Sequence, residues 1–332
     1  MEASLTSGST LVLLAGVCQG SFLAPAKAIR KWAWENYWFI FAATAYFLSP
    51  WILALITVPH LFSVYRDISF SVLLLVTVFG IGWGLGALFF GLAIEAVGLS
   101  LGFAIILGTS AAIGTLVPLI ATHETRTPHT VIVTVAWLTL MLLGVTVCSL
   151  SGKWRESDSA RPRSYSRGLA ICLLSGLLSG SGNLGFFFGR EIAEKAHLLG
   201  APDYSATNAI WTFLALPLFI CNGGYAVYLM RRNDTAQLYR TERSVRDGAL
   251  ALSMGVLWMA GFSLYGAGAR RLGALGPSLG WAMMMATMVV VANALGIATG
   301  EWTGAPLHSK RQLAIGLLLL ICAVVGLGLS NH

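Results

Sequence analysis

The stretch FGIGWGLGALFFGLAIEAVGLSL, residues 79–101, decides the fold of this chain. It is apolar for longer than the roughly 20 residues that a helix needs to cross a bilayer. Glycines nevertheless interrupt it, among them those at positions 80, 82, 84, 86 and 91. A helix that touches only lipid gains nothing from them, because each glycine costs backbone entropy and packs no side chain. Spacing such as that of Gly82 and Gly86 instead lets a neighbouring helix approach closely within a membrane bundle.

The composition supports a membrane protein. Of 332 residues, 56% are hydrophobic and only 11% are charged, and the mean hydropathy is +0.75, whereas soluble domains contain about 25% charged residues. The five cysteines stand singly within apolar segments and show no metal-ligand spacing, so we expect neither a metal site nor a disulfide framework. Residues 1–10 lack the basic region of a cleavable signal peptide.

The hydropathy pattern predicts an all-α fold of ten transmembrane helices. Their expected ranges are 8–26, 37–58, 70–94, 99–121, 130–150, 168–189, 207–230, 248–268, 277–298 and 311–330. The split near Gly98 and the limits of the ninth helix are the least sharply defined.

The basic residues alternate between successive loops. Fifteen lysines and arginines lie in loops that follow odd-numbered helices, and six lie in the even-numbered loops. The positive-inside rule therefore places the odd loops in the cytoplasm and both termini outside. This pattern also accounts for the net charge of +7 without a nucleic-acid partner, and the lipid bilayer is the expected partner of the surface.

The chain contains two similar halves. Gly16 and Gly20 followed by Ser21 recur as Gly176, Gly180 and Ser181, and Trp83 and Trp258 are followed by matching glycines up to Ser100-Leu101-Gly102 and Ser278-Leu279-Gly280. We expect a five-helix repeat in 1–150, a basic cytoplasmic linker in 151–167 and a second repeat in 168–332. Because five is odd, the repeats are inverted relative to one another, as in secondary transporters. The glycines expected to pack helices are Gly16, Gly20, Gly82, Gly86, Gly98 and Gly102; they serve equally within one subunit or between two, and we expect a monomer.

Polar and aromatic residues inside the helices are the candidate substrate ligands. Polar groups are expensive in a bilayer and merit a functional hypothesis, although each amide can equally hydrogen-bond a neighbouring helix. Amides beside aromatic faces suit a neutral polyhydroxy ligand. The expected substrate-binding set is Gln19, Trp83, Asn183, Asn208, Trp258, Phe262 and Tyr265.

Three acids are candidates for proton coupling: Glu35, Glu95 and Glu301. Glu35 is expected between two helices, among tryptophans that would dehydrate it and raise its pKa, and is the first to test. The alternative for each is a permanently ionised residue at the membrane surface.

No enzyme motif is found. The glycines of 80–84 resemble a dinucleotide-binding loop, but no strand precedes them and no ribose-binding acid follows. We therefore expect no catalytic residues and no cofactor.

Several motifs in the first half of the chain match the pattern of a known protein family. They are Ala24-Pro25-x-Lys27-x-x-x-Lys31-Trp32-x-Trp34-Glu35-x-x-Trp38, Phe79-Gly80-x-x-Trp83-Gly84-x-Gly86, and Gly114-Thr115-Leu116-x-Pro118, with a thinner match around Trp258, Tyr265 and Glu301-Trp302. With these motifs the sequence resembles the L-rhamnose–proton symporter family of the drug/metabolite transporter superfamily. The resemblance implies two inverted five-helix halves, alternating access, and sugar uptake driven by protons.

Two departures from the family pattern bear on the substrate. Ala87 stands where family members have Asn, and residues 276–281 read Gly-Pro-Ser-Leu-Gly-Trp where they have Gln, Tyr and Asp. The expected substrate is L-rhamnose or a related deoxyhexose. The alternatives are an exporter or permease for another metabolite on the same fold, and a non-transporting membrane subunit such as a sensor, although the loops are too short for a sensor domain.

Overall fold

The computed structural model describes residues 2–97, 99–122, 127–155 and 165–329, and every regular element in these ranges is helical. In chain order the elements are α1 (Glu2–Ser21), η1 (Ala24–Ala28), α2 (Trp34–Ala43), η2 (Thr44–Leu48), α3 (Ser49–Thr57), α4 (Leu61–Asp67), α5 (Phe70–Val97), α6 (Leu99–Ala121), α7 (Pro128–Arg155), α8 (Tyr165–Phe188), α9 (Arg190–Leu198), α10 (Asn208–Arg232), η3 (Ala236–Arg240), α11 (Ser244–Arg271), η4 (Gly273–Leu275), η5 (Gly276–Gly280), α12 (Trp281–Ala298) and α13 (Leu307–Leu329).

Ten segments in the described part of the chain are long and apolar enough to cross a bilayer, and each coincides with a predicted span. They include Leu5–Ala28, Trp34–Thr57 and Ser244–Arg271. The chain is therefore a multi-pass, all-α membrane protein. Gly98, where the sequence predicts the split between the third and fourth spans, lies outside the described residues, as do positions 156–164 of the predicted linker.

Two of the helix starts that differ from the sequence prediction involve acidic residues. Glu35 belongs to the first turn of α2 rather than to a connection between helices. Helix α11 begins at Ser244, four residues before the predicted start at 248, and so contains Asp247. Both differences arise because a helix continues beyond its apolar core wherever its polar first turn finds hydrogen-bond partners.

Two spans contain a π turn. The second span is formed by α2, the π turn η2 and α3, and the ninth consists of the π turn η5 followed by α12. Pro277 is at the start of η5. A π turn shifts the register of the helix and is frequent at functional sites.

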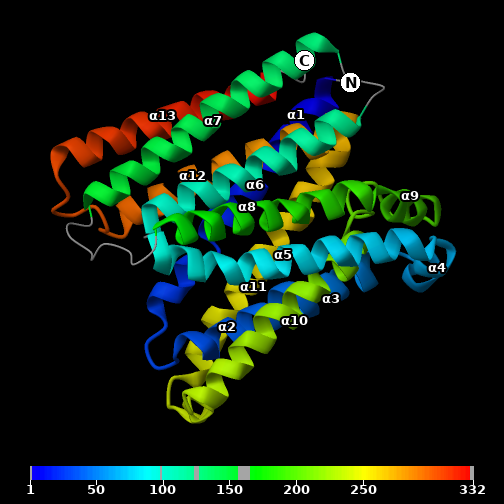
Figure 1. Cartoon of the computed structure of the whole chain (residues 1–332). Coiled ribbons are helices and arrows are strands. Elements are labelled where there is room, and N and C mark those ends of the chain that lie inside the picture. Colours follow the sequence, from blue (N-terminus) through cyan, green and yellow to red (C-terminus); the bar gives the residue numbers. More distant parts are fainter. Residues whose placement is uncertain (1, 98, 123–126, 156–164, 330–332) are drawn as a thin grey trace.

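The helices pack in a reciprocal pattern. Helix α1 packs mainly against α11 and α12, and α8 packs mainly against α5 and α6. Helices α1 and α8 run in opposite directions, and α7 lies beside α13 (Figure 1). Helix α1 therefore contacts helices from the second half of the chain, and α8 contacts helices from the first half.

Glycines allow these close approaches. A Cβ atom on Gly16 would lie 2.5 Å from Cβ of Thr287 on α12, and one on Gly20 would lie 2.7 Å from the Met288 carbonyl oxygen. On α5, a Cβ on Gly82 would lie 2.8 Å from a Ser181 oxygen. The corresponding distance from Gly86 to the Ser179 nitrogen is 2.7 Å. Gly102 is buried on α6.

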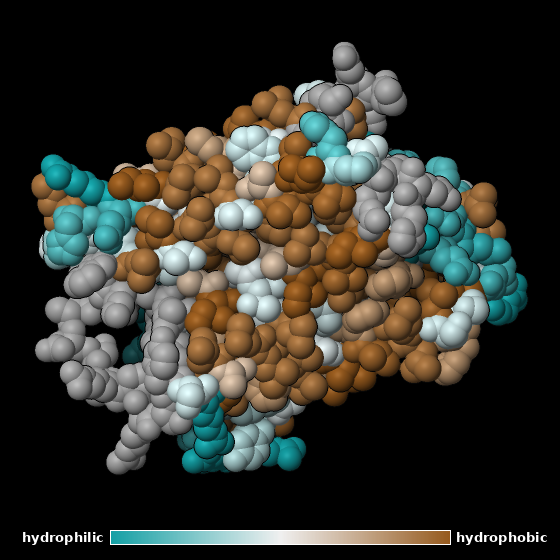
Figure 2. Space-filling model, turned by 45° about the horizontal axis from the view of Figure 1, so that its top comes forward, coloured by the Kyte–Doolittle hydropathy of each residue, from teal (hydrophilic) through white to brown (hydrophobic). Residues whose placement is uncertain are grey.

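The molecule has two polar ends and an apolar middle. The termini lie at the same end as α4 and α9, and the connections from α1 to α2 and from α10 to α11 lie at the opposite end (Figure 1). On the face in Figure 2, hydrophobic residues cover the middle and hydrophilic residues gather at the ends. This distribution is that of a bundle whose helices cross a bilayer between the two ends.

Candidate functional site

A cluster of aromatic rings occupies the middle of the bundle. Trp83 lies half-way along α5 and Trp258 half-way along α11, and their ring centroids are 5.6 Å apart. Phe262, one turn after Trp258, is 4.4 Å from the Trp258 ring and 5.1 Å from the Trp83 ring. The sequence predicted all three as substrate ligands, and the structure brings them together. We refer to them, with Trp211, as the central aromatic cluster.

Trp211 on α10 is the member of this cluster that the sequence prediction missed. Its ring is 5.0 Å from that of Phe262 and stacks on Phe186 at 5.2 Å. The side chain is 1% exposed, yet its indole N–H has no hydrogen-bond partner among the described residues. Buried tryptophan N–H groups usually find a partner, so this donor is available to a ligand that enters the cluster.

Thr207, one helical turn before Trp211, also has a buried polar group without a partner. Its hydroxyl is buried and has no hydrogen-bond partner in the part of the chain that the structure describes. A Cβ atom on Gly266 of α11 would lie 2.3 Å from this hydroxyl. The signal for both residues was their spacing of one helical turn on the same face of a buried helix.

An amide network adjoins the cluster. Tyr265 donates its hydroxyl hydrogen to Asn183 Oδ1 at 2.5 Å. Asn183 Nδ2 in turn donates to the backbone oxygens of Gly114 at 2.6 Å and Pro277 at 2.8 Å. Asn183 and Tyr265 are fully buried, and the Tyr265 ring contacts Phe186, which links the network to Trp211.

This network includes the segment in which the sequence departs from the family pattern. The π turn η5 presents the Pro277 carbonyl to Asn183, and Ser278 donates to the Thr115 oxygen at 2.8 Å. Backbone oxygens of Pro277 and Thr115 thus accept the hydrogen bonds in and beside this segment.

Two further predicted ligands lie beside the cluster. Gln19 is buried and donates through Nε2 to the Trp258 carbonyl oxygen at 2.7 Å. Asn208 begins α10, accepts a hydrogen bond from Ser263 at 2.8 Å and donates to Thr57 at 3.0 Å. Gln19 thus contacts the backbone of Trp258 in the cluster. Asn208 is linked to the cluster through Ser263, the residue that follows Phe262.

The central rings pack against one another. Two hollows, of about 430 Å³ and 360 Å³, lie at the ends of the molecule, lined by Glu301–Ala305 and by Leu55–Ser63. Neither is lined by residues of the central aromatic cluster. A ligand at the cluster must therefore separate rings that are in contact here.

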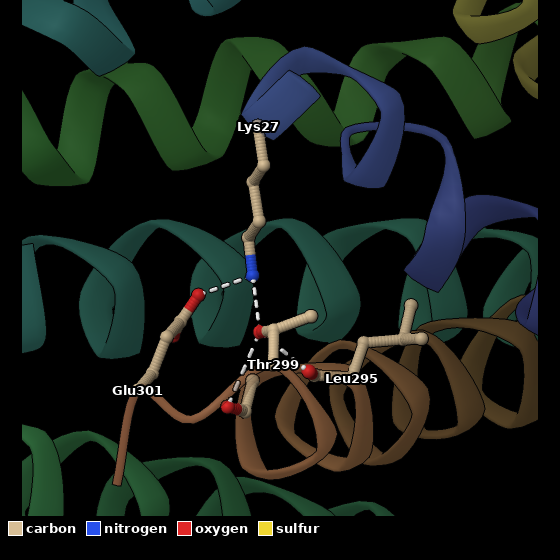
Figure 3. A network of polar contacts seen from close by, with 5 residues as sticks. Lys27, Leu295, Thr299 and Glu301 are labelled. Atoms are coloured by element: carbon tan, nitrogen blue, oxygen red, sulfur yellow. Dashed lines mark hydrogen bonds and ion pairs between the residues drawn. The ribbon is translucent and has the colours of Figure 1, made fainter. Parts of the chain in front are cut away.

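The predicted acids lie at the end of the molecule that holds the α1–α2 connection. Glu301 pairs with Lys27, which also donates to Thr299 at 2.8 Å (Figure 3). Figure 3 shows that Lys27 reaches from the α1–α2 connection to the turn that follows α12. The side chain of Glu95, in the last turn of α5, lies outside the described residues.

Glu35 binds the connection between α10 and α11. Its Oε1 accepts hydrogen bonds from Asn233 at 3.0 Å and Thr235 at 2.9 Å. Glu35 is buried, as the sequence predicts, but these donors and the start of α2 stabilise its ionised carboxylate and offset the dehydration. Nearby, burial raises the pKa of Tyr239 to about 12, and the charge of Glu35 acts in the same direction, although a hydrogen bond to the Asn36 oxygen opposes the rise.

The opposite end is closed by other contacts. Lys195 on α9 forms an ion pair with Asp67 of α4 at 3.0 Å, and the hydrogen bond from Lys195 lowers the pKa of Asp67. Tyr65 on α4 donates to the Ala209 carbonyl at 3.0 Å. Both ends of the bundle are therefore bridged in this structure.

Comparison with known proteins identifies the family. The model of the L-rhamnose-proton symport protein (RhaT) family matches residues 1–331. The chain belongs to this family. L-rhamnose-proton symporters of Shigella dysenteriae serotype 1 (strain Sd197) and Escherichia coli O1:K1 / APEC are each 25% identical to it over 350 residues, with 100% of both chains covered. One solved crystal structure superposes with a TM-score of 0.58 over 98% of both chains at 15% identity, which supports the fold alone.

Proposed function

We propose that this chain is a proton-coupled symporter that imports L-rhamnose or a related deoxyhexose by alternating access. The family match over residues 1–331 carries the proposal. The middle of the bundle supports it, because aromatic faces beside buried amides suit a neutral polyhydroxy ligand. A charged substrate would need a countercharge, and the described contacts of the cluster involve none.

The central aromatic cluster is the proposed sugar site. A sugar between Trp83 and Trp258 would meet apolar ring faces, and its hydroxyl oxygens would accept hydrogen bonds from the N–H of Trp211. Asn183, Tyr265 and Gln19 stand beside the rings, where their hydrogen bonds can be exchanged for bonds to sugar. The ligand would thus satisfy a buried donor that is unpartnered without it.

The bridged ends are the proposed gates. Glu301 with Lys27, and Glu35 with Asn233 and Thr235, join the α1–α2 connection to later parts of the chain. Because donors hold both carboxylates in their ionised form, we assign Glu35 and Glu301 to closing this end rather than to proton transport. Asp67 with Lys195 serves the opposite end.

We further propose two inverted repeats, 1–150 and 168–332, joined by the linker. Matching contacts of α1 and α8, the first helices of the two proposed repeats, support the inverted arrangement. A Cβ on Gly16 would lie 2.5 Å from Thr287 Cβ, and one on Gly176 would lie 2.6 Å from Thr109 Cβ. One turn later, Gly20 faces Val291 and Gly180 faces Ile113. Helices α1 and α8 also run in opposite directions (Figure 1).

The proposed setting is the bacterial inner membrane, with a monomer whose termini lie in the periplasm. The excess of basic residues in the odd-numbered loops supports this orientation. The end that contains Lys27 would then face the cytoplasm.

The test is sugar-dependent alkalinisation. De-energised cells that make the protein are placed in weakly buffered medium, and L-rhamnose is added while the external pH is recorded. We expect a rise in pH that is absent with L-fucose and absent from cells without the protein. Exchange of labelled rhamnose without a pH change would contradict proton coupling, and the absence of both would contradict rhamnose as the substrate.

A further inference from the structure

Asp247 on α11 is an acid that the sequence analysis did not single out. Its side chain is 0% exposed. Oδ2 accepts one hydrogen bond, from the backbone N–H of Lys31 at 2.9 Å. Oδ1 is buried and has no hydrogen-bond partner among the described residues.

The other described acids differ from Asp247. Glu35 has two side-chain donors, and Glu301, Asp67 and Asp203 each pair with a lysine or an arginine. Among the acids whose side chains the structure describes, Asp247 is the most deeply buried. Asp247 lies in the first turn of α11, which favours an anion. An ionised carboxylate with a single donor is nevertheless costly there, because desolvation disfavours the charge and one oxygen remains unsatisfied. Proton binding removes that charge.

The charged groups around Asp247 are occupied or exposed. On the elements packed against the start of α11, Lys27 of η1 binds Glu301 and Thr299, Glu35 of α2 binds Asn233 and Thr235, and Tyr239 of η3 donates to the Asn36 oxygen. The remaining charged residues nearby are exposed: Arg30, Lys31, Arg240, Glu242, Arg243 and Arg246. No ion pair to Asp247 occurs in the described part of the chain.

The segment 29–33 covers this carboxyl group. Lys31 supplies the N–H, and Trp32 donates its indole hydrogen to Ser244 on α11 at 3.4 Å. The Trp32 ring also packs at Gly248, where a Cβ atom would lie 3.2 Å from it. Movement of this segment away from α11 would remove the donor of Asp247 and expose its carboxyl group in one step.

We propose that Asp247 binds the proton that is transported with the sugar, and that segment 29–33 controls its release. A proton that water delivers from the opposite end of the molecule binds a carboxylate oxygen and forms the carboxylic acid while the segment covers it. When the segment moves away, water stabilises the carboxylate and the proton leaves at that end of the molecule. This proposal rests on the proposed function for its sugar, but proton binding at Asp247 can be measured without substrate.

The experiment compares wild type, Asp247→Asn and Asp234→Asn in purified form and in proteoliposomes. Asn keeps an acceptor for the Lys31 N–H but cannot ionise. Asp234 is the matched control, because it is exposed near the same end and its φ of 53° suits Asn. We expect Asp247→Asn to exchange labelled L-rhamnose within about threefold of wild type, and to lose both accumulation under a pH gradient and sugar-dependent alkalinisation. Asp234→Asn should behave as wild type.

The substrate-independent measurement is thermal unfolding in detergent across pH. The Tm of Asp247→Asn relative to wild type should rise as the pH increases, because only the wild type then carries the buried charge, whereas the difference for Asp234→Asn should stay constant. The opposite trend would mean that the folded state stabilises the carboxylate and would contradict the proposal. Normal accumulation by Asp247→Asn, or a pH-independent Tm difference, would overturn the proposal. If wild type neither exchanges nor accumulates rhamnose but the Tm difference still varies with pH, the assigned sugar is wrong and the proton site stands.

A second variant covers the case in which Asp247→Asn does not fold. Asp247→Glu keeps the ionisable group but extends it by one methylene beneath segment 29–33. We expect it to retain accumulation with a shifted pH profile. An unchanged profile, or accumulation lost at every pH while exchange persists, would contradict the assignment.

Discussion

Trp83 on α5 and Trp258 on α11 face one another in the middle of the bundle, with ring centroids 5.6 Å apart. The two residues come from different halves of the chain and begin the matching glycine patterns of the sequence. A site at the junction of two repeats would therefore use one equivalent ring from each. In an alternating-access mechanism, such a site can be reached from either end by movement of one half against the other.

Replacing either tryptophan by Phe should weaken sugar binding. The change keeps an apolar ring but removes part of its face, and we expect KM for L-rhamnose to rise about tenfold, equivalent to about 1.4 kcal/mol. Trp137→Phe is the matched control, because Trp137 is half-buried like Trp83 but packs at Gly326 of α13. Initial rates of labelled rhamnose uptake measure the effect. An equal rise in KM for all three variants would show that the two central rings have no special role.

Trp211→Phe tests whether the indole N–H of Trp211 donates a hydrogen bond to the sugar. The change removes an unsatisfied buried N–H, which favours the fold, but the smaller ring leaves a cavity between Phe186 and Phe262, so we expect Tm to fall. If the N–H donates to the sugar, KM should rise about two- to tenfold, the value of one neutral hydrogen bond. Thermal unfolding and uptake kinetics on the same preparation give both numbers, and unchanged KM would exclude this role.

Thr207→Val tests the neighbouring hydroxyl in the same way. Thr134→Val is its control, because Thr134 has a buried hydroxyl without a described partner on α7. We expect Thr207→Val alone to raise KM for rhamnose, by about two- to tenfold. An equal effect from the two variants in uptake assays would contradict a ligand role for Thr207.

The sequence was sufficient to predict the ten spans, because apolar length and hydropathy decide where a chain crosses a bilayer. It also singled out Trp83, Trp258 and Phe262, since large rings far from the membrane surface are unusual. It could not predict Asp247 as a buried acid. The start of α11 at Ser244 depends on the covering segment 29–33, which is more than 200 residues away in the chain. Trp211 was missed for a similar reason, because its unpartnered N–H is a property of its neighbours.

The Asp67–Lys195 pair should make stability depend on pH. The folded state lowers the pKa of Asp67. The pair therefore stabilises the fold above the unfolded pKa, and this contribution is lost as the pH falls through the folded pKa. Asp67→Asn should lower Tm at about pH 7, and the difference from wild type should disappear below the folded pKa. A Tm difference that persists in acid would show that the substitution acts through packing.

The Lys27–Glu301 pair should hold its end of the molecule closed. Both side chains are nearly half exposed, so we expect neutralising either one to weaken closure by only about 0.2–1 kcal/mol. That change corresponds to a roughly 1.5- to 5-fold faster reaction of a cysteine placed at Ala26 with an impermeant maleimide. The exchanged variant Lys27→Glu with Glu301→Lys should restore the slow rate in a cysteine-free background. If it does not, Lys27 acts through Thr299 and not through the charge pair.

Gly182→Ala should disturb the sugar site without touching a polar group. A Cβ atom on Gly182 of α8 would lie 2.5 Å from the Trp83 ring, so the ring must shift. Overpacking of this kind costs about 1–3 kcal/mol, part of which is offset by the better helix propensity of Ala, about 1 kcal/mol. Stability should therefore fall little, while displacement of a ligand ring should lower kcat/KM about tenfold or more.

Two comparisons make this prediction specific. Gly224→Ala on α10 introduces the same methyl group where no atom lies within 4 Å, and should leave transport unchanged. Trp83→Phe in the Gly182→Ala background frees space beside the new methyl group. The double variant should therefore lose less activity than the sum of the two single changes, expressed as free energies. Strict additivity would mean that Gly182 affects transport by some route other than the position of the Trp83 ring.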